Sequence, residues 1–152
     1  MEKQKVYIET SVICYLTAKP SSDIVVAGHQ KSTYDWWNKT KSKFDCYISG
    51  FVFDEISKGD KNASIKRLGI VKNFKYLEIN EDIEKLAEKY FNLFNIPEKS
   101  KFDSLHLAIS VWYNIDFLLS WNCKHIANAI VNQRLREYNY KNNLHSIILC
   151  TP

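Results

Sequence analysis

Three acidic side chains stand beside apolar stretches of this sequence, where a carboxylate is costly to bury without a partner. Glu9 follows the apolar run 6–8, Glu55 precedes Ile56, and Asp103 opens an apolar stretch. Three carboxylates that converge on one pocket repel one another, so at least one takes up a proton unless cations are bound. Mg²⁺ or Mn²⁺ would relieve this repulsion, because both ions prefer oxygen ligands and often bind carboxylates together with substrate phosphates. Such a site is suited to the hydrolysis of phosphodiesters.

Two of these acids also have plainer interpretations. Glu9 could be a surface acid at the end of a strand, although the hydroxyls of Thr10 and Ser11 suit an ordered, capped turn after it. Glu55 has a second acid, Asp54, beside it. From the residues alone, either of the pair could face a site, or both could be solvated.

The third acid belongs to a polar stripe on an apolar helix. Asp103, His106 and Ser110 fall at i, i+3 and i+7, on one face of the expected helix. Asp103 either caps this helix or has a ligand. We interpret His106 as a hydrogen-bonded histidine rather than a ligand, because the expected ions prefer oxygen. Further along, Lys124 and His125 could contact a phosphate or could simply begin a helix.

The elements that would position these groups alternate between strands and helices. Strands are expected over 5–9, 45–49, 76–79, 116–121 and 146–150, and helices over 11–17, 49–56, 102–113, 124–140 and after the candidate caps Ser22, Asp60 and Asn80. This alternation predicts a parallel α/β sandwich, in which ligands bind beyond the carboxyl ends of the strands. Glu9 and Asn122 lie at such ends, so we expect them at one edge, with helices bringing Glu55 and Asp103 to it.

Composition narrows the class of protein. The 152 residues, 45% hydrophobic and 25% charged, suit one globular domain over 1–152 rather than a disordered chain. No apolar run approaches the roughly 20 residues of a membrane helix, and the acid directly after residues 6–8 argues against a signal peptide. Four scattered cysteines form no C-x-x-C pair, which favours a reducing cytoplasm over a disulfide framework. The net charge of +4 is compatible with a polyanionic partner.

Taken together, four short motifs resemble those of the PIN-domain nucleases, including the VapC-like toxins of VapBC-type (type II) toxin–antitoxin pairs. The motifs are Glu9-Thr10-Ser11, Glu55, Asp103-Ser104-Leu105-His106-Leu107-Ala108 and Asn122. They resemble the family's D-T-S-like opening, its early-helix acid, its D-x-x-H-x-A-like helix and the position of its fourth acid. Glu9 stands where most of the family has Asp, and Asn122 replaces the fourth acid. The E-T-S opening, together with Trp121-Asn122-Cys123-Lys124-His125, looks like one branch of VapC-like proteins.

The resemblance implies a PIN-like three-layer α/β/α sandwich with a central parallel sheet of four to five strands. It further implies an endoribonuclease that depends on Mg²⁺ or Mn²⁺, with Glu9, Glu55 and Asp103 holding the ion. Asn122 would orient water or metal, which favours a one-metal mechanism. Thr10, Ser11 and Asp116 would support the site. In the family, such toxins are commonly homodimers silenced by a small antitoxin whose tail occupies the site.

Three other functions remain compatible with the residues. The changes at Glu9 and Asn122 could have left a PIN-like module that binds RNA or a protein without cutting. A stand-alone RNA-processing nuclease would lack an antitoxin. An unrelated metal phosphohydrolase would act on small phosphoesters instead of RNA.

Overall fold

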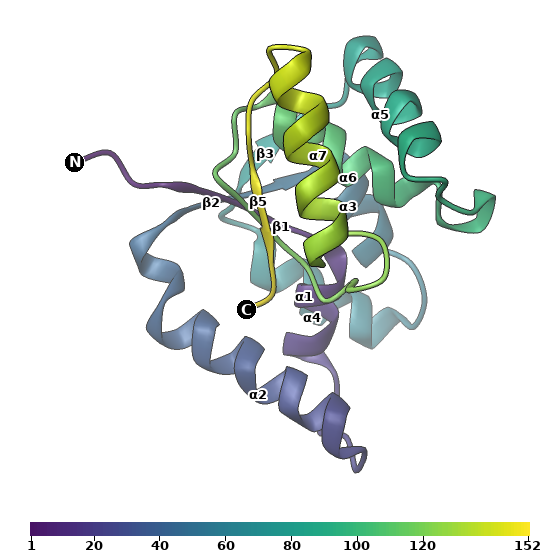
Figure 1. Cartoon of the computed structure of the whole chain (residues 1–152). Coiled ribbons are helices and arrows are strands. Elements are labelled where there is room, and N and C mark those ends of the chain that lie inside the picture. The colour runs from purple at the N-terminus through teal and green to yellow at the C-terminus, as the bar shows by residue number, and fades with distance from the viewer.

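The computed structural model describes residues 1–152 and is built on a parallel five-stranded sheet (Figure 1). The strands are β1 (Lys5–Ile8), β2 (Asp45–Ser49), β3 (Lys75–Leu77), β4 (Phe117–Leu119) and β5 (Ile148–Cys150). Their order across the sheet is β3-β2-β1-β4-β5, and every neighbouring pair is parallel. The predicted α/β class and the predicted sheet of four to five parallel strands are confirmed.

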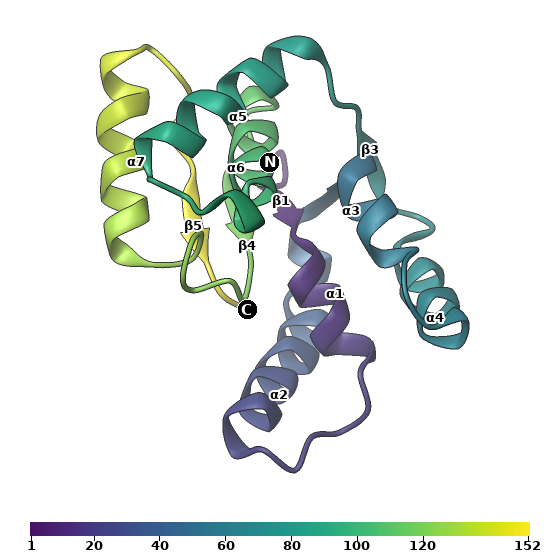
Figure 2. The same cartoon turned by 90° about the vertical axis from the view of Figure 1, so that its right-hand side faces the viewer.

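Seven α-helices and two short 3₁₀ turns connect the strands. They are α1 (Thr10–Thr17), α2 (Ile24–Lys39), α3 (Gly50–Ile56), α4 (Lys61–Val71), α5 (Glu81–Leu93), α6 (Phe102–Trp112) and α7 (Ala129–Lys141), with 3₁₀ turns at Lys41–Lys43 and Glu98–Ser100. Helix α1 contacts α2, α3 and α4, whereas α5 packs along α6. In both views α5, α6 and α7 lie above β1, and α1, α2 and α4 lie below it (Figures 1 and 2). The sheet is therefore the middle of three layers.

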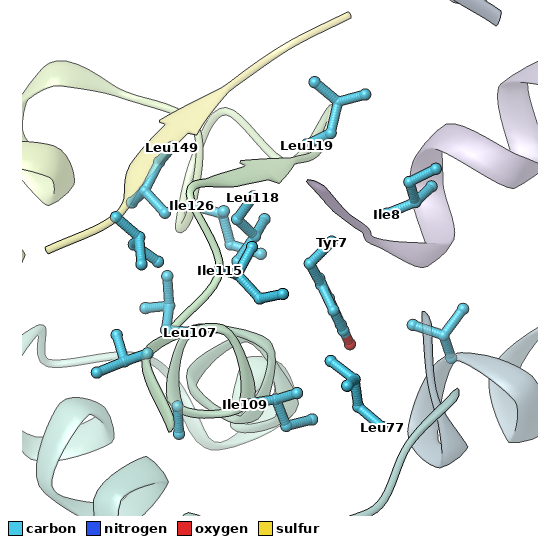
Figure 3. Close-up of a cluster of buried hydrophobic side chains, with 14 of the residues drawn as sticks. Tyr7, Ile8, Leu77, Leu107, Ile109, Ile115, Leu118, Leu119, Ile126 and Leu149 are labelled. Carbon is cyan, nitrogen blue, oxygen red and sulfur yellow. The ribbon is translucent and has the colours of Figure 1, made fainter. Parts of the chain in front are cut away.

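The hydrophobic core surrounds the central strands and α6 (Figure 3). Val6, Tyr7 and Ile8 of β1 are all at most 2% exposed, so both faces of this strand are covered, as is typical of a parallel sheet. Helix α6 is buried at seven of its eleven positions, including Ser104, His106 and Ser110. His106 and Ser110 of the polar stripe therefore lie inside the protein, where each polar group needs a partner, and Asp103 is half-buried.

Side-chain caps set several helix starts. Ser49, Asp60 and Asn80 accept hydrogen bonds from backbone N–H groups in the first turns of α3, α4 and α5, as expected. The expected cap at Ser22 is wrong, because Asp23 accepts from two backbone N–H groups there.

The helix expected from Lys124 begins only at Ala129. Residues 123–128 form turns instead, and Asn128 caps α7 by accepting from the N–H of Val131. None of the seven helices combines the length and apolar character needed to cross a membrane.

Candidate metal centre

The Glu9 carboxylate lies where two neighbouring strands end. Glu9 directly follows β1, and Ser120 directly follows β4, which pairs with β1 in parallel. Oε2 of Glu9 accepts hydrogen bonds from the hydroxyls of Ser11 and, at 2.7 Å, Ser120. The Ser11 oxygen also accepts the backbone N–H of Trp121. Glu9 is only 7% exposed, so its carboxylate is fixed by two hydroxyls rather than solvated at the surface.

The Glu55 carboxylate reaches the same edge from α3. Its Oε1 accepts a 2.6 Å hydrogen bond from the hydroxyl of Thr10, the residue after Glu9. The same oxygen lies 3.2 Å from Nε2 of His106. Asp54 is exposed and lies near Tyr76, where its charge adds to the effect of burial in raising the pKa of that phenol. Of the two adjacent acids, Glu55 is therefore the one that meets Glu9.

The imidazole of His106 lies between these two carboxylates. Its Nε2 is 3.2 Å from Glu55 and 3.9 Å from Oε1 of Glu9, and the side chain is 2% exposed. One ligand atom from each of Glu9, Glu55 and His106 lies within 4.8 Å of the other two. The expectation of a hydrogen-bonded histidine agrees with this geometry, but sequence reasoning did not place His106 among the acids.

The far side of the imidazole is held by Tyr7. The Tyr7 hydroxyl lies 2.8 Å from Nδ1 of His106 and 2.8 Å from Oγ of Ser49. Ser49 is also the cap of α3, the helix that carries Glu55. This chain of contacts links β1, α3 and α6 behind the candidate site.

Asp103 occupies the first turn of α6, one turn before His106. It does not cap the helix, because the capping position is Lys101 and no side chain caps there. Burial raises the pKa of Asp103, while the side-chain amide of Asn122 and the imidazoles of His106 and His125 oppose the shift. Asn122 uses its Oδ1 to accept the backbone N–H of His125 at 3.1 Å, so its NH₂ group is left to face Asp103. Asn122 thus supports an acid rather than presenting a free oxygen.

The charges in the cluster partly neutralise one another. Burial alone would raise the pKa of Glu55, but hydrogen bonds from His106 and Thr10 outweigh it and lower that pKa. Burial alone would lower the pKa of His106, yet its hydrogen bond to Glu55 and the nearby charges of Glu9 and Asp103 raise it overall. The raised pKa of His106 therefore favours a protonated, positively charged imidazole between the carboxylates.

Comparisons with known proteins bear on the fold. The sequence matches no described protein family and no curated protein. Solved structures that resemble the chain include two from toxin–antitoxin systems. VapC20 of Mycobacterium tuberculosis, described as a toxin that cleaves the sarcin-ricin loop, superposes with a TM-score of 0.62 at 15% identity, over 79% of this chain and 92% of that one.

VapBC2 from Rickettsia felis, solved with a DNA fragment from its promoter, superposes with a TM-score of 0.61 at 13% identity. This match covers 98% of this chain and 99% of the other. The chain has a PIN-like fold.

Two other expected site residues, Asp116 and Lys124, lie apart from the carboxylates. Asp116 precedes β4 and accepts the backbone N–H of Lys5 at 2.7 Å, at the amino end of β1. It therefore joins two strands at the edge opposite the carboxylates. Lys124 is exposed in the turns before α7, so the alternative that Lys124 and His125 begin a helix is wrong.

The carboxylate oxygens at this site suit a hard divalent cation. Oε2 of Glu9 and Oε1 of Glu55 are engaged by hydroxyls, and each carboxylate keeps its second oxygen clear of them. Asp103 lies outside the close group of Glu9, Glu55 and His106, but it is near enough for the charge of Glu9 to add to the effect of burial on its pKa. Carboxylate oxygens are the ligands that Mg²⁺ and Mn²⁺ prefer. The residues present are therefore compatible with the predicted ion.

Sequence reasoning missed Ser120 and Tyr7, which hold the site from behind. Ser120 carried a weak signal, because it is a polar residue at the end of an apolar strand. Tyr7 carried none, since a tyrosine in a buried strand is usually interpreted by its ring rather than its hydroxyl.

Proposed function

We propose that this protein is a divalent-cation-dependent endoribonuclease of the VapC type, the toxin of a toxin–antitoxin pair. The observation that carries the proposal is the meeting of Glu9, Glu55 and His106, with Asp103 one turn away, at the carboxyl edge of the sheet. VapC20, a sarcin-ricin loop cleaving toxin, has a similar fold. A single RNA-cleaving site at this edge accounts for both features.

Each residue has a distinct part in the proposed reaction. Glu9, Glu55 and Asp103 would hold Mg²⁺ or Mn²⁺, which when bound would polarise the phosphate and lower the pKa of a water molecule. Thr10, Ser11 and Ser120 keep two of these carboxylates in place through hydroxyl donors. Asn122 keeps Asp103 oriented and, as an amide, cannot act as a base. The absence of a fourth acid at this position supports a single cation.

Partners follow from the same proposal. A small antitoxin is supported by the fold shared with the VapBC2 pair of Rickettsia felis. A homodimer is supported by three exposed aromatic side chains on α3, β3 and α6, namely Phe53, Tyr76 and Phe102. We place the protein in the cytoplasm, because its four cysteines are all free. We treat the chain as a single domain, because it has one sheet and one hydrophobic core.

One observation favours a second candidate, a PIN-like module that binds RNA or a protein without cutting. The imidazole of His106 lies between Glu9 and Glu55, and its raised pKa favours a positive charge there. A cluster balanced in this way needs no ion to remain folded. Such a module would bind its partner equally well with and without a divalent cation.

The test is cleavage of a mixed pool of structured and single-stranded RNA with Mg²⁺ or Mn²⁺, in parallel with EDTA. Asp103→Asn is the site variant and Asp54→Asn, at the exposed acid, is the matched control. We expect cleavage that EDTA and Asp103→Asn abolish and that Asp54→Asn preserves. No cleavage by the folded, antitoxin-free protein with either ion would refute the proposal. Turnover of a chromogenic phosphomonoester without RNA cleavage would point to a small-phosphoester hydrolase.

A further inference from the structure

A cavity of about 450 Å³ lies between the end of α5 and the start of α7. Of its nine lining residues, none is acidic. Two apolar lining residues, Phe94 and Ile96, come from the turn after α5. Lys124 and His125 come from the turns before α7, and Ile130 and Arg134 come from α7 itself.

The cavity adjoins the candidate metal centre through His125. The backbone N–H of His125 donates to Asn122, the residue whose amide faces Asp103. The His125 imidazole is also close enough to Asp103 to affect the pKa of that acid. A chain molecule with one phosphate at the carboxylates could therefore place a neighbouring unit in the cavity.

The rim of the cavity carries two unpaired positive charges. Lys124 and Arg134 are exposed, and neither lies within 4.0 Å of a carboxylate. Several other lysines of the chain do pair with an acid, as Lys75 does with Asp45. A guanidinium and an ammonium that line one cavity, with no acid in its lining, suit a phosphate.

The inner wall of the cavity is apolar. Ile96 and Val131 are 5% and 8% exposed and form its depth, and Phe94 lies beside them. Ile130, which is 65% exposed, stands at the mouth. An apolar wall with a few cationic groups at its rim suits a flat, uncharged ring attached to a phosphate.

We propose that this cavity binds one nucleotide of single-stranded RNA next to the bond that is cut. The base lies against Phe94 and Ile96, and its phosphate lies between Lys124 and Arg134. This inference rests on the proposed ribonuclease function and adds to it a site for a flanking nucleotide on the α7 side of the carboxylates.

The test measures binding separately from cleavage, using a short fluorescein-labelled single-stranded RNA of random sequence in EDTA. Fluorescence anisotropy is recorded for the wild type, Arg134→Ala and the matched control Arg136→Ala. Arg136 is an exposed arginine of the same helix that does not line the cavity. We expect Arg134→Ala to weaken binding about tenfold. It should also reduce the slope of log affinity against log salt by about 0.7, because one phosphate contact is lost. Arg136→Ala should leave both quantities unchanged.

A second variant fills the cavity without changing charge. Ala129 is an exposed lining residue, so Ala129→Trp should obstruct the base while retaining the salt slope of the wild type.

If the wild type binds and cleaves RNA but Arg134→Ala and Arg136→Ala behave alike, the cavity is not a nucleotide site and the ribonuclease proposal stands. If the wild type neither binds nor cleaves RNA, both proposals are overturned.

Discussion

The phenolic oxygen of Tyr7 lies 2.8 Å from Nδ1 of His106, in the interior of the protein. The opposite nitrogen of that imidazole faces Glu55 at 3.2 Å. Burial raises the pKa of Tyr7 well above its ordinary value, so its hydroxyl remains protonated near neutral pH. A neutral group in the first strand thus fixes the direction in which His106 meets the acids.

Removing the Tyr7 hydroxyl should destabilise the protein. Tyr7→Phe leaves both Nδ1 of His106 and the hydroxyl of Ser49 without this partner, and we expect a loss of about 1–3 kcal/mol in the free energy of unfolding. Urea unfolding measures this loss. Tyr140→Phe is the control, because Tyr140 is 85% exposed. Equal stabilities of the two variants would show that the buried hydroxyl contributes nothing.

The Ser120 hydroxyl should matter for ion binding as well as for folding, where its oxygen also accepts the backbone N–H of Asn122. It donates to Oε2 of Glu9 and holds the carboxylate in one orientation. Partners of this kind typically change metal affinity by about 10- to 100-fold. We therefore expect the Ser120→Ala variant to need about 10 to 100 times more Mn²⁺ than the wild type for the same increase in melting temperature. Ser22→Ala, at an exposed serine, is the control and should need the same Mn²⁺ concentration as the wild type. An unchanged Mn²⁺ requirement would contradict this role of Ser120.

Introducing an acid at residue 122 should lower stability without an ion and enlarge the stabilisation that an ion gives. Asn122→Asp keeps an oxygen that can accept the N–H of His125 but replaces the amide facing Asp103 with a second negative charge. We expect a lower melting temperature in EDTA and a larger increase on adding Mn²⁺. A variant that melts like the wild type in EDTA would mean that residue 122 does not interact with Asp103.

The cation-free protein should lose stability as the pH rises through the raised pKa of His106. The pKa of His106 is raised in the folded state by Glu55 and the other acids, against the effect of burial. Protonation of His106 thus stabilises the fold fully below its ordinary pKa of about 6.5, and this contribution disappears as pH rises through the raised value. Urea unfolding in EDTA from about pH 6 to about pH 9 measures the slope. His106→Gln should flatten it, and a wild-type slope of the opposite sign would contradict the assignment.

Much of the fold could be predicted because its signals are local. Alternating apolar strands and helices, with caps at Ser49, Asp60 and Asn80, predicted the parallel sheet and most helix starts. The start of α7 could not be predicted, because Asn122 and Asn128 both bond to nearby backbone and keep residues 123–128 in turns.

The site was predictable where topology alone decides position. Glu9 and Ser120 meet because Ile8 pairs with Leu119 and parallel strands end at one edge. The stripe of Asp103 and His106 was also visible in the sequence. The direction in which this stripe faces could not be predicted, because the face that α6 turns toward β1 depends on packing across the whole core. Only the structure reveals that His106 lies between two acids.

The most direct measurement is isothermal titration of Mn²⁺ into the wild type and into Glu9→Gln, Glu55→Gln and Asp103→Asn, each first shown to be folded. Asp54→Asn serves as the control acid. If three carboxylates form one cation site, the wild type and Asp54→Asn bind one Mn²⁺ with the same affinity, and each of the other variants binds it much more weakly. Wild-type affinity in all three site variants, or no Mn²⁺ binding by the wild type, would contradict the proposed metal centre.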